Sequence, residues 1–338
     1  NFDFCMSNSE CKGLVITSEG RMFIAGADIS EFGVETPQGI PELEDVIRKI
    51  ELAPKPVIAA LNGMALGGGM ELAMGCHYRL ADPSVTVGQP EVNLGFIPGG
   101  GGTQRLPRLV GPELALEMIV TGKPINASKA YEAGAIDEII DEDLVESAIQ
   151  LALSKAKKPD ELRRTGDLHE KIKDVDPKVF DNWRQKISLK SRYRRSPFEC
   201  INTVEAATKI GFEAGLAYER EVFIELRDSD EGKSMRHMFF AERGVAKIPD
   251  IPKETKTQNI NKAAIIGSGT MGGGIAMNFA NVGIPAVVVD INEDALKIGL
   301  DRVKNNYSSS VAKGRMSQEK MDQTMNLISG ATNYSEIS

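Results

Sequence analysis

Short apolar runs alternate with helical patterns along the first 155 residues of the chain. Residues 13–17 and 55–61 are compact apolar runs of the kind that form buried strands, and Asn62-Gly63 closes the second run with a turn signal. Residues 42–51, between the two runs, carry apolar side chains at helical spacing. Strands that alternate with helices predict an α/β fold for this part.

Two further parts follow. Residues 156–258 are rich in charge, show apolar positions at helical spacing from Ile201 to Leu226, and end on the proline-marked linker 247–255. A new strand pattern begins at Lys262. We therefore predict an α/β domain over residues 1–155, a helical segment with linker over 156–258, and a second α/β domain that starts at 259 and runs to 338.

Composition excludes several classes of protein. The 338 residues carry a net charge of −8, which speaks against a nucleic-acid partner, and apolar runs are too short for a membrane span. Cys5, Cys11, Cys76 and Cys200 form no Cys-x-x-Cys pair, and the three histidines have no ligand spacing, so we predict free thiols and no metal. We expect a soluble, intracellular protein.

Two glutamates stand beside glycine turns. Three glycines, 67–69, come directly before a helix-forming run that contains Glu71, and Glu91 follows twenty residues later. Glycine turns at 23–28, 66–69 and 97–103 can expose backbone N–H groups, and two such amides would stabilise the oxyanion of a thioester carbonyl. The two acids could divide general-acid and general-base work. The alternative is that each acid only stabilises the start of a helix, as we also expect Thr103 to do as an N-cap.

A second candidate site lies near the end of the chain. The apolar strand from Lys262 runs into Gly267-x-Gly269-x-x-Gly272, then a helical run, then a second strand that ends at Asp290. In a dinucleotide site these glycines make the turn, admit the pyrophosphate and let helix and strand pack closely, while the acid holds the ribose and favours NAD over NADP. The alternative is a structural strand–helix–strand turn.

Four segments in order make the first part resemble the enoyl-CoA hydratase/isomerase (crotonase) family: residues 25–29, 55–63, 66–71 and 89–105. The resemblance implies that Ala27 and Gly68 supply the oxyanion-hole amides and that Gly99 helps to position water. It implies that Glu71 activates the water and that Glu91 protonates the α-carbon. The presence of both glutamates favours a hydratase, which is a type of lyase. Δ3-Δ2-enoyl-CoA isomerisation stays open as a second activity.

The last part resembles the NAD-binding start of 3-hydroxyacyl-CoA dehydrogenase, so the whole chain resembles the multifunctional enzymes of fatty-acid β-oxidation. The fold class that this implies is α/β: a crotonase-like domain, a helical linker, and the start of a Rossmann domain. Strands of the family ahead of Gly13 and the dehydrogenase's later histidine and helical domain are missing, which indicates a fragment truncated at both ends. We therefore expect at most weak NAD binding and no NAD-dependent oxidation by this chain.

The implied activity is the hydration of 2-trans-enoyl-CoA to 3-hydroxyacyl-CoA, with a coenzyme A thioester as substrate and NAD as the cofactor of the last part. Two alternatives stay open, namely another crotonase-family acyl-CoA reaction and a non-catalytic NAD-binding fragment. The resemblance leaves oligomerisation or association with a thiolase open. We expect a bacterial cytoplasm, with the peroxisomal matrix as the alternative compartment.

Overall fold

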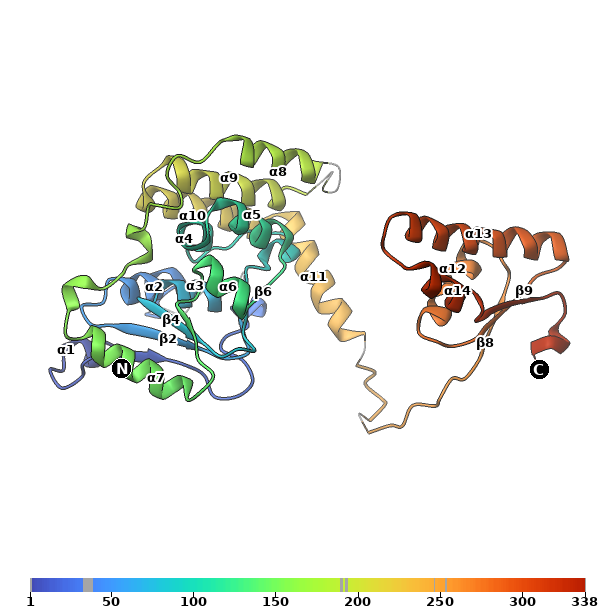
Figure 1. Cartoon of the computed structure of the whole chain (residues 1–338), viewed down its shortest axis with the longest axis horizontal. Coiled ribbons are helices and arrows are strands. Elements are labelled where there is room, and N and C mark those ends of the chain that lie inside the picture. The colour runs from blue at the N-terminus through green and yellow to red at the C-terminus, as the bar shows by residue number, and fades with distance from the viewer. Residues whose placement is uncertain are drawn as a thin grey trace. The chain divides into compact units, whose positions relative to one another are not determined.

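The chain divides into two compact units, Asn1–Lys247 and Ile248–Ser338 (Figure 1). This computed structural model describes residues 2–32, 39–188, 191, 194–245, 247–252 and 254–337. The ends of the predicted domains at residues 1 and 338, and residue 253 of the predicted linker, lie outside these ranges. Most of the predicted helical segment, up to residue 247, groups with the first unit.

The first unit contains a parallel sheet in the order β1-β2-β4-β7. Every residue of β2 (Val57–Leu61) is buried, as expected for a central parallel strand that is covered on both faces. Ile58 packs toward α7 (Leu144–Lys155) on one face, whereas Ala59 enters the main core on the other. The other strands of this sheet are β1 (Leu14–Ile16), β4 (Tyr78–Ala81) and β7 (Glu138–Ile139).

A smaller sheet and several helices complete the α/β part of this unit. The small sheet has the order β3-β5-β6, with strands β3 (Met64–Leu66), β5 (Thr86–Gly88) and β6 (Ile125–Asn126). Its helices are α1 (Phe2–Ser7), α2 (Leu43–Glu51), α3 (Gly68–Gly75), α4 (Gly102–Val110), α5 (Pro112–Thr121) and α6 (Ala127–Ala133), with short 3₁₀ turns η1 (Ile29–Glu31), η2 (Glu91–Leu94), η3 (Pro159–Glu161) and η4 (Thr165–Asp167).

A helical layer packs on α4 and α5. It consists of α8 (Lys178–Ser188), α9 (Ser196–Lys209), α10 (Phe212–Asp228) and α11 (Asp230–Gly244). Helix α9 contacts α4, α5 and α10, and α10 contacts α4 directly. The glycine turn that precedes α4 is therefore within reach of a helix that lies more than 100 residues later in the chain.

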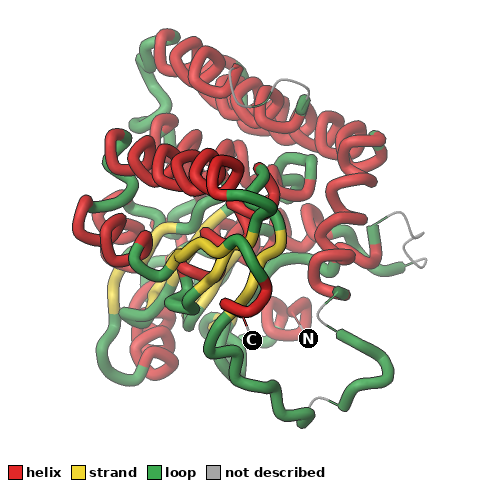
Figure 2. The backbone as a smooth tube through the Cα atoms, turned by 90° about the vertical axis from the view of Figure 1, so that its right-hand side faces the viewer, coloured by secondary structure: helices red, strands yellow, loops and turns green. Residues whose placement is uncertain are grey.

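The second unit is a three-stranded parallel sheet with its helices on one face (Figure 2). The strand order is β10-β9-β8, with β8 (Ala263–Ile266), β9 (Ala286–Val289) and β10 (Ile328–Ala331). Helices α12 (Thr270–Asn281), α13 (Glu293–Ala312) and α14 (Gln318–Met325) share one apolar cluster with the sheet. On the opposite face, the buried residues of β9 and β10 meet Ile337 of the 3₁₀ turn η5 (Tyr334–Ile337).

The apolar patterns predicted these elements well. The strand runs at 13–17, 55–61 and 262–266 become β1, β2 and β8, and the helical spacing at 42–51 becomes α2. The prediction for Thr103 was wrong, because α4 begins at Gly102 with Gly101 as its N-cap residue. Within the described residues, no helix combines the length and the apolar character that a membrane crossing requires.

Candidate active site

The glycine turn at residues 67–69 joins β3 to α3 and favours glycine at positions 67 and 69. Gly67 adopts φ 52° and ψ −129°, a backbone conformation that is strained for any residue with a Cβ. A Cβ on Gly69 would lie 2.2 Å from the Ile24 carbonyl oxygen. The segment that contains Ile24 thus presses against the start of α3, where the first N–H groups of the helix have no partner within the helix.

This close approach places the Ala27 backbone beside Gly68. The Ala27 nitrogen lies 3.5 Å from the position that a Cβ of Gly68 would occupy. The contact is held by pairing of Ile24 with β3, in which the Leu66 N–H donates to the Ile24 carbonyl oxygen at 3.0 Å. The two amides named from the sequence are therefore neighbours, although 41 residues separate them along the chain.

Glu71 lies in the first turn of α3 and is 2% exposed. Its Oε1 accepts hydrogen bonds from the Gly100 N–H at 2.7 Å and from the Gly102 N–H at 2.9 Å. Burial raises the pKa of Glu71, whereas these two amides and the positive charge of Arg105 lower it. The carboxylate form of Glu71 therefore has dedicated donors.

Glu91 begins η2 and occupies a different environment. Its Oε1 lies 2.7 Å from the position that a Cβ of Gly67 would take, so it reaches the same glycine turn. The Gln89 amide nitrogen, in the orientation that satisfies both side chains, donates to the two Glu91 oxygens at 3.1 and 3.2 Å. Burial and, next, the negative charge of Glu71 raise the pKa of Glu91 well above its ordinary value.

These unequal environments can divide acid and base work between the two glutamates. Glu71 holds a negative charge more readily because two backbone N–H groups point at it, and Glu91 then keeps its proton because Glu71 is charged. An ionised carboxylate can activate water and a neutral carboxyl can deliver a proton to carbon. The Ala27 backbone lies next to Gly68, so these two segments are close to each other at the start of α3.

Gly99 lies in the turn that covers Glu71, and an aromatic ring packs on it. A Cβ on Gly99 would lie 2.5 Å from Cγ of Phe223, on α10. Phe223 also makes edge-to-face contacts with Phe32 and Phe96, with ring centroids 6.0 and 5.6 Å apart. This aromatic cluster joins the glycine turn to the helical layer.

A buried ion pair supports the same turn. Arg105 Nη1 donates to the Gly100 carbonyl oxygen at 2.9 Å, and its Nη2 pairs with Glu51 Oε2 at 2.7 Å. The other oxygen of Glu51 accepts from the Gly166 N–H at 2.8 Å. Removing either charge would leave its partner buried and unpaired, which is strongly destabilising.

Two side chains at this site were missed from the sequence. Gln89 stands in the same segment as Glu91, so its proximity had a local signal. Glu219 is buried on α10 and accepts from Gly101 N at 2.5 Å, 118 residues away in the chain. No local pattern connects Glu219 to that turn.

The second unit carries its glycine fingerprint where β8 runs into α12. Gly267 has φ +95°, and a Cβ on Gly272 would lie 1.8 Å from the Gly267 carbonyl oxygen, so both positions require glycine. Gly269 is the N-cap residue of α12, and nothing lies within 4 Å of its Cβ position. The space beside Gly269 is open, as close approach of a pyrophosphate to the helix start would need.

Asp290 follows β9 and faces this turn. It accepts from the Ser268 N–H at 2.7 Å and from the Ser268 hydroxyl, and its other oxygen accepts from the Ile291 N–H at 2.7 Å. The Ser268 hydrogen bonds lower the pKa of Asp290. The residues present therefore fit a dinucleotide, whereas among the described residues no group of three or more His, Cys, Asp or Glu side chains could hold a metal.

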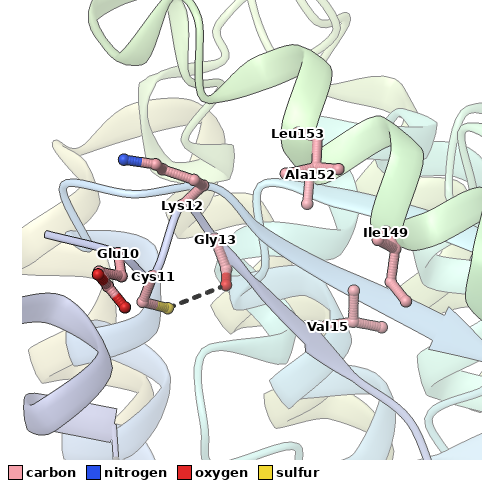
Figure 3. Close-up of a pocket in the computed structure, with 8 residues that line it drawn as sticks. All are labelled: Glu10, Cys11, Lys12, Gly13, Val15, Ile149, Ala152 and Leu153. Atoms are coloured by element: carbon pink, nitrogen blue, oxygen red, sulfur yellow. Dashed lines mark hydrogen bonds between the residues drawn. The ribbon is translucent and has the colours of Figure 1, made fainter. Parts of the chain in front are cut away.

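A separate hollow of about 290 Å³ lies beside β1 and α7 (Figure 3). Ile149, Leu153 and Val15 line it, and the Cys11 thiol donates to the Gly13 carbonyl oxygen at its edge. The lining is mainly apolar and includes none of the glutamates described above. Nothing in this hollow suggests chemistry.

Comparisons with known protein families agree with the two units. Residues 2–188 match the family described as enoyl-CoA hydratase/isomerase. Residues 262–338 match the family described as 3-hydroxyacyl-CoA dehydrogenase, NAD binding domain. The first match covers more than half of the chain.

Curated relatives share both parts. The peroxisomal fatty acid beta-oxidation multifunctional protein MFP2 of Arabidopsis thaliana is 38% identical over 99% of this chain and 48% of its own length. The peroxisomal bifunctional enzyme of Cavia porcellus is 35% identical over 92% of this chain and 43% of its own. The fatty acid oxidation complex subunit alpha of Idiomarina loihiensis is 33% identical over 95% and 46%. The chain spans about half the length of these relatives.

A solved structure shows the same fold for the first unit. The enoyl-CoA hydratase/isomerase of Pseudoalteromonas atlantica covers 71% of this chain and 83% of its own, with a TM-score of 0.51 and 21% identity. At that identity the likeness shows the fold alone.

Proposed function

The chain belongs to the enoyl-CoA hydratase/isomerase family, and from that premise we propose that its first unit hydrates 2-trans-enoyl-CoA thioesters to 3-hydroxyacyl-CoA. The observation that carries the proposal is the unequal pair of buried glutamates. Glu71 accepts two backbone hydrogen bonds, whereas Glu91 lies close enough for the charge of Glu71 to raise its pKa. A hydration needs one base and one acid, and this pair supplies both.

The proposed mechanism assigns one task to each group. The Glu71 carboxylate takes a proton from water as the water oxygen bonds to C3, with Gly99 helping to position that water. The electrons of the double bond move toward the thioester oxygen, which the Ala27 and Gly68 amides stabilise. Glu91 then delivers its proton to C2, and the carbonyl re-forms. A proton passed from Glu71 to Glu91 afterwards restores both groups, so the sum of the steps is the addition of one water and no redox partner is required.

The direct test is an assay with crotonyl-CoA, following loss of the conjugated thioester absorbance. We expect turnover by the purified chain and none by a chain that carries both Glu71→Gln and Glu91→Gln. Release of free coenzyme A would instead indicate thioester hydrolysis, and conversion of a 3-enoyl-CoA alone would indicate an isomerase. A folded chain with no reaction on any of these thioesters would refute the proposal and favour the non-catalytic alternative.

For the second unit we propose NAD binding at the turn 267–272, with Asp290 on the adenosine ribose. The fit of Gly267, Gly269 and Gly272 supports this, as does the match of residues 262–338 to an NAD-binding domain. NAD bound there would supply a hydride acceptor for 3-hydroxyacyl-CoA, the product of the first unit, in a longer protein of this kind. All three histidines of this chain precede Gly267, so the second unit itself contributes no histidine as a proton acceptor.

For the cellular compartment and the binding partners of the protein, two possibilities each stay open. The relatives carry peroxisomal names in a plant and an animal, and the bacterial relative is named as a subunit of a complex. These names support either compartment expected from the sequence, a bacterial cytoplasm or a peroxisomal matrix. Association with another copy or with a thiolase stays a prediction, which the mass of the purified particle would test.

A further inference from the structure

Four successive amides, two in the turn before α4 and two at the start of that helix, donate to two different glutamates. Gly100 and Gly102 donate to Glu71, whereas Gly101 and Thr103 donate to Glu219 at 2.5 and 2.7 Å. The two carboxylates come from α3 and α10. Alternate amides of one short turn are therefore held by two helices that are distant in sequence.

The Glu219 carboxyl group is buried and makes specific hydrogen bonds to the start of α4. Glu219 is 1% exposed, and its Oε2 also accepts from the Thr103 hydroxyl at 2.5 Å. Among the described residues, Glu219 forms no salt bridge, so N–H and O–H donors alone satisfy it. These hydrogen bonds offset the cost of burying the carboxyl group, which would be large without them.

The glycine turn packs tightly against Glu71 and against α10, which carries Glu219. Cβ positions on Gly100 and Gly102 would lie 2.9 and 2.8 Å from Glu71 oxygens. One helical turn beyond Glu219, the ring of Phe223 fills the space next to Gly99. Movement of α10 would therefore be transmitted directly to the amides that hold Glu71.

We propose that Glu219 is a positioning residue for the hydration: it fixes the 99–103 turn through alternate amides and thereby holds the Glu71 carboxylate and the Gly99 amide in register. This inference rests on the proposed hydratase function. It also places an essential part of the active site on α10, beyond residues 2–188 that match the family. A helix cap without a catalytic consequence is the competing account.

The pH dependence of the reaction distinguishes the positioning role from a helix cap, because a helix cap without a catalytic consequence would leave it unchanged. The charged groups that interact electrostatically with Glu219 are Glu71 on α3 and Glu91 on η2. Burial and the charge of Glu71 raise the pKa of Glu219 to about 8, and the charge of Glu219 in turn raises the pKa of Glu91. Ionised Glu219 thus helps Glu91 to keep its proton at alkaline pH.

The experiment compares Glu219→Gln with Glu221→Gln in the full chain, because Glu221 lies on the same helix and is exposed. We measure kcat and KM for crotonyl-CoA between pH 6 and 10, and the thermal midpoint of each variant. Glu219→Gln should lower kcat by roughly 10-fold to 100-fold with little change in KM, and should move the alkaline limb toward lower pH. Glu221→Gln should behave as the wild type.

Two results would overturn the positioning role. One is an unchanged kcat and pH profile in folded Glu219→Gln, and the other is a loss that follows the unfolded fraction alone. If Glu219→Gln does not fold, Thr103→Val removes one of the three donors and should still lower kcat by about threefold to tenfold with KM preserved. An unchanged kcat in Thr103→Val would then overturn it. Inactive wild type and Glu221→Gln would count against the hydratase function itself.

Discussion

Replacing Gly67 with alanine tests whether the glycine turn sets the position of Glu91. The new Cβ would lie 2.7 Å from Glu91 Oε1, whereas an ordinary contact is at least 3.4 Å. The carboxyl group must therefore retreat by roughly 0.7 Å, since the other neighbour at that point is backbone. Glu91 cannot retreat freely, because it is buried and Gln89 holds both of its oxygens.

The expected loss follows from that displacement. A misplacement of about 1 Å in a reacting group can cost on the order of 100-fold in rate, so Gly67→Ala should lower kcat by roughly 10-fold to 100-fold. The unusual backbone at Gly67 adds a stability cost of about 1–3 kcal/mol, because its φ of 52° is strained for alanine. Activity and stability must therefore be measured together.

Gly111→Ala is the matched control for the backbone cost. Gly111 has φ +82° between α4 and α5, and nothing lies within 4 Å of its Cβ position. Both variants should lower the thermal midpoint, but only Gly67→Ala should lower kcat for crotonyl-CoA at a temperature where both are folded. Equal losses of kcat in the two variants, or wild-type kcat in Gly67→Ala, would refute the geometric argument.

The remaining predictions address the two acids, the stability of the first unit and the dinucleotide turn. Glu91→Gln should abolish hydration and any isomerisation, whereas Glu71→Gln should lower hydration more than isomerisation. Each loss should be about 10²–10⁴-fold in rate. Near-normal hydration by Glu91→Gln would contradict the assignment. Burial lowers the pKa of His77 to about 4, so His77 should favour folding above pH 6.5, and that contribution, on the order of 3 kcal/mol, should be lost as pH falls toward 4. Urea unfolding at several pH values measures this loss, and His77→Asn, which keeps an acceptor for the Val57 N–H, should flatten it. Asp290→Ala should weaken NAD binding by about tenfold in a calorimetric titration and reduce the preference of the protein for NAD over NADP. Unchanged affinity would show that Asp290 does not contact the ribose.

Strands and local turns could be predicted because their signals are local. The apolar run at 55–61 predicts a buried strand whatever surrounds it, and β2 is buried throughout. The glycines at 67–69 predict a turn because each needs freedom that other residues lack, and Gly67 and Gly69 show that need directly. Thr103 was assigned to the wrong role because a hydroxyl near a helix start resembles an N-cap, whereas here it donates to a carboxylate from another helix.

The assembly of the site could not be read from local patterns. The spacing of 20 residues between Glu71 and Glu91 fixes no distance, so the chemistry of two acids beside glycine turns suggested the pair but could not place it. Glu219 had no signal at all, because its position on α10 is a periodic helical one and its partners lie 116 and 118 residues earlier. Long-range hydrogen bonds of this kind depend on how helices pack, which a periodicity does not specify.

The strand that carries the dinucleotide turn, β8, lies at an edge of its sheet. Within the described residues β8 pairs only with β9, and Ile266, the last residue before Gly267, is 69% exposed. Open edges and uncovered apolar faces make a strand prone to local opening. A ligand that grips the turn must then order β8 as it binds, so its apparent affinity is its intrinsic affinity reduced by the fraction of molecules in which β8 is already in place. Binding of this kind would register as slowed amide exchange along β8 as well as at the turn.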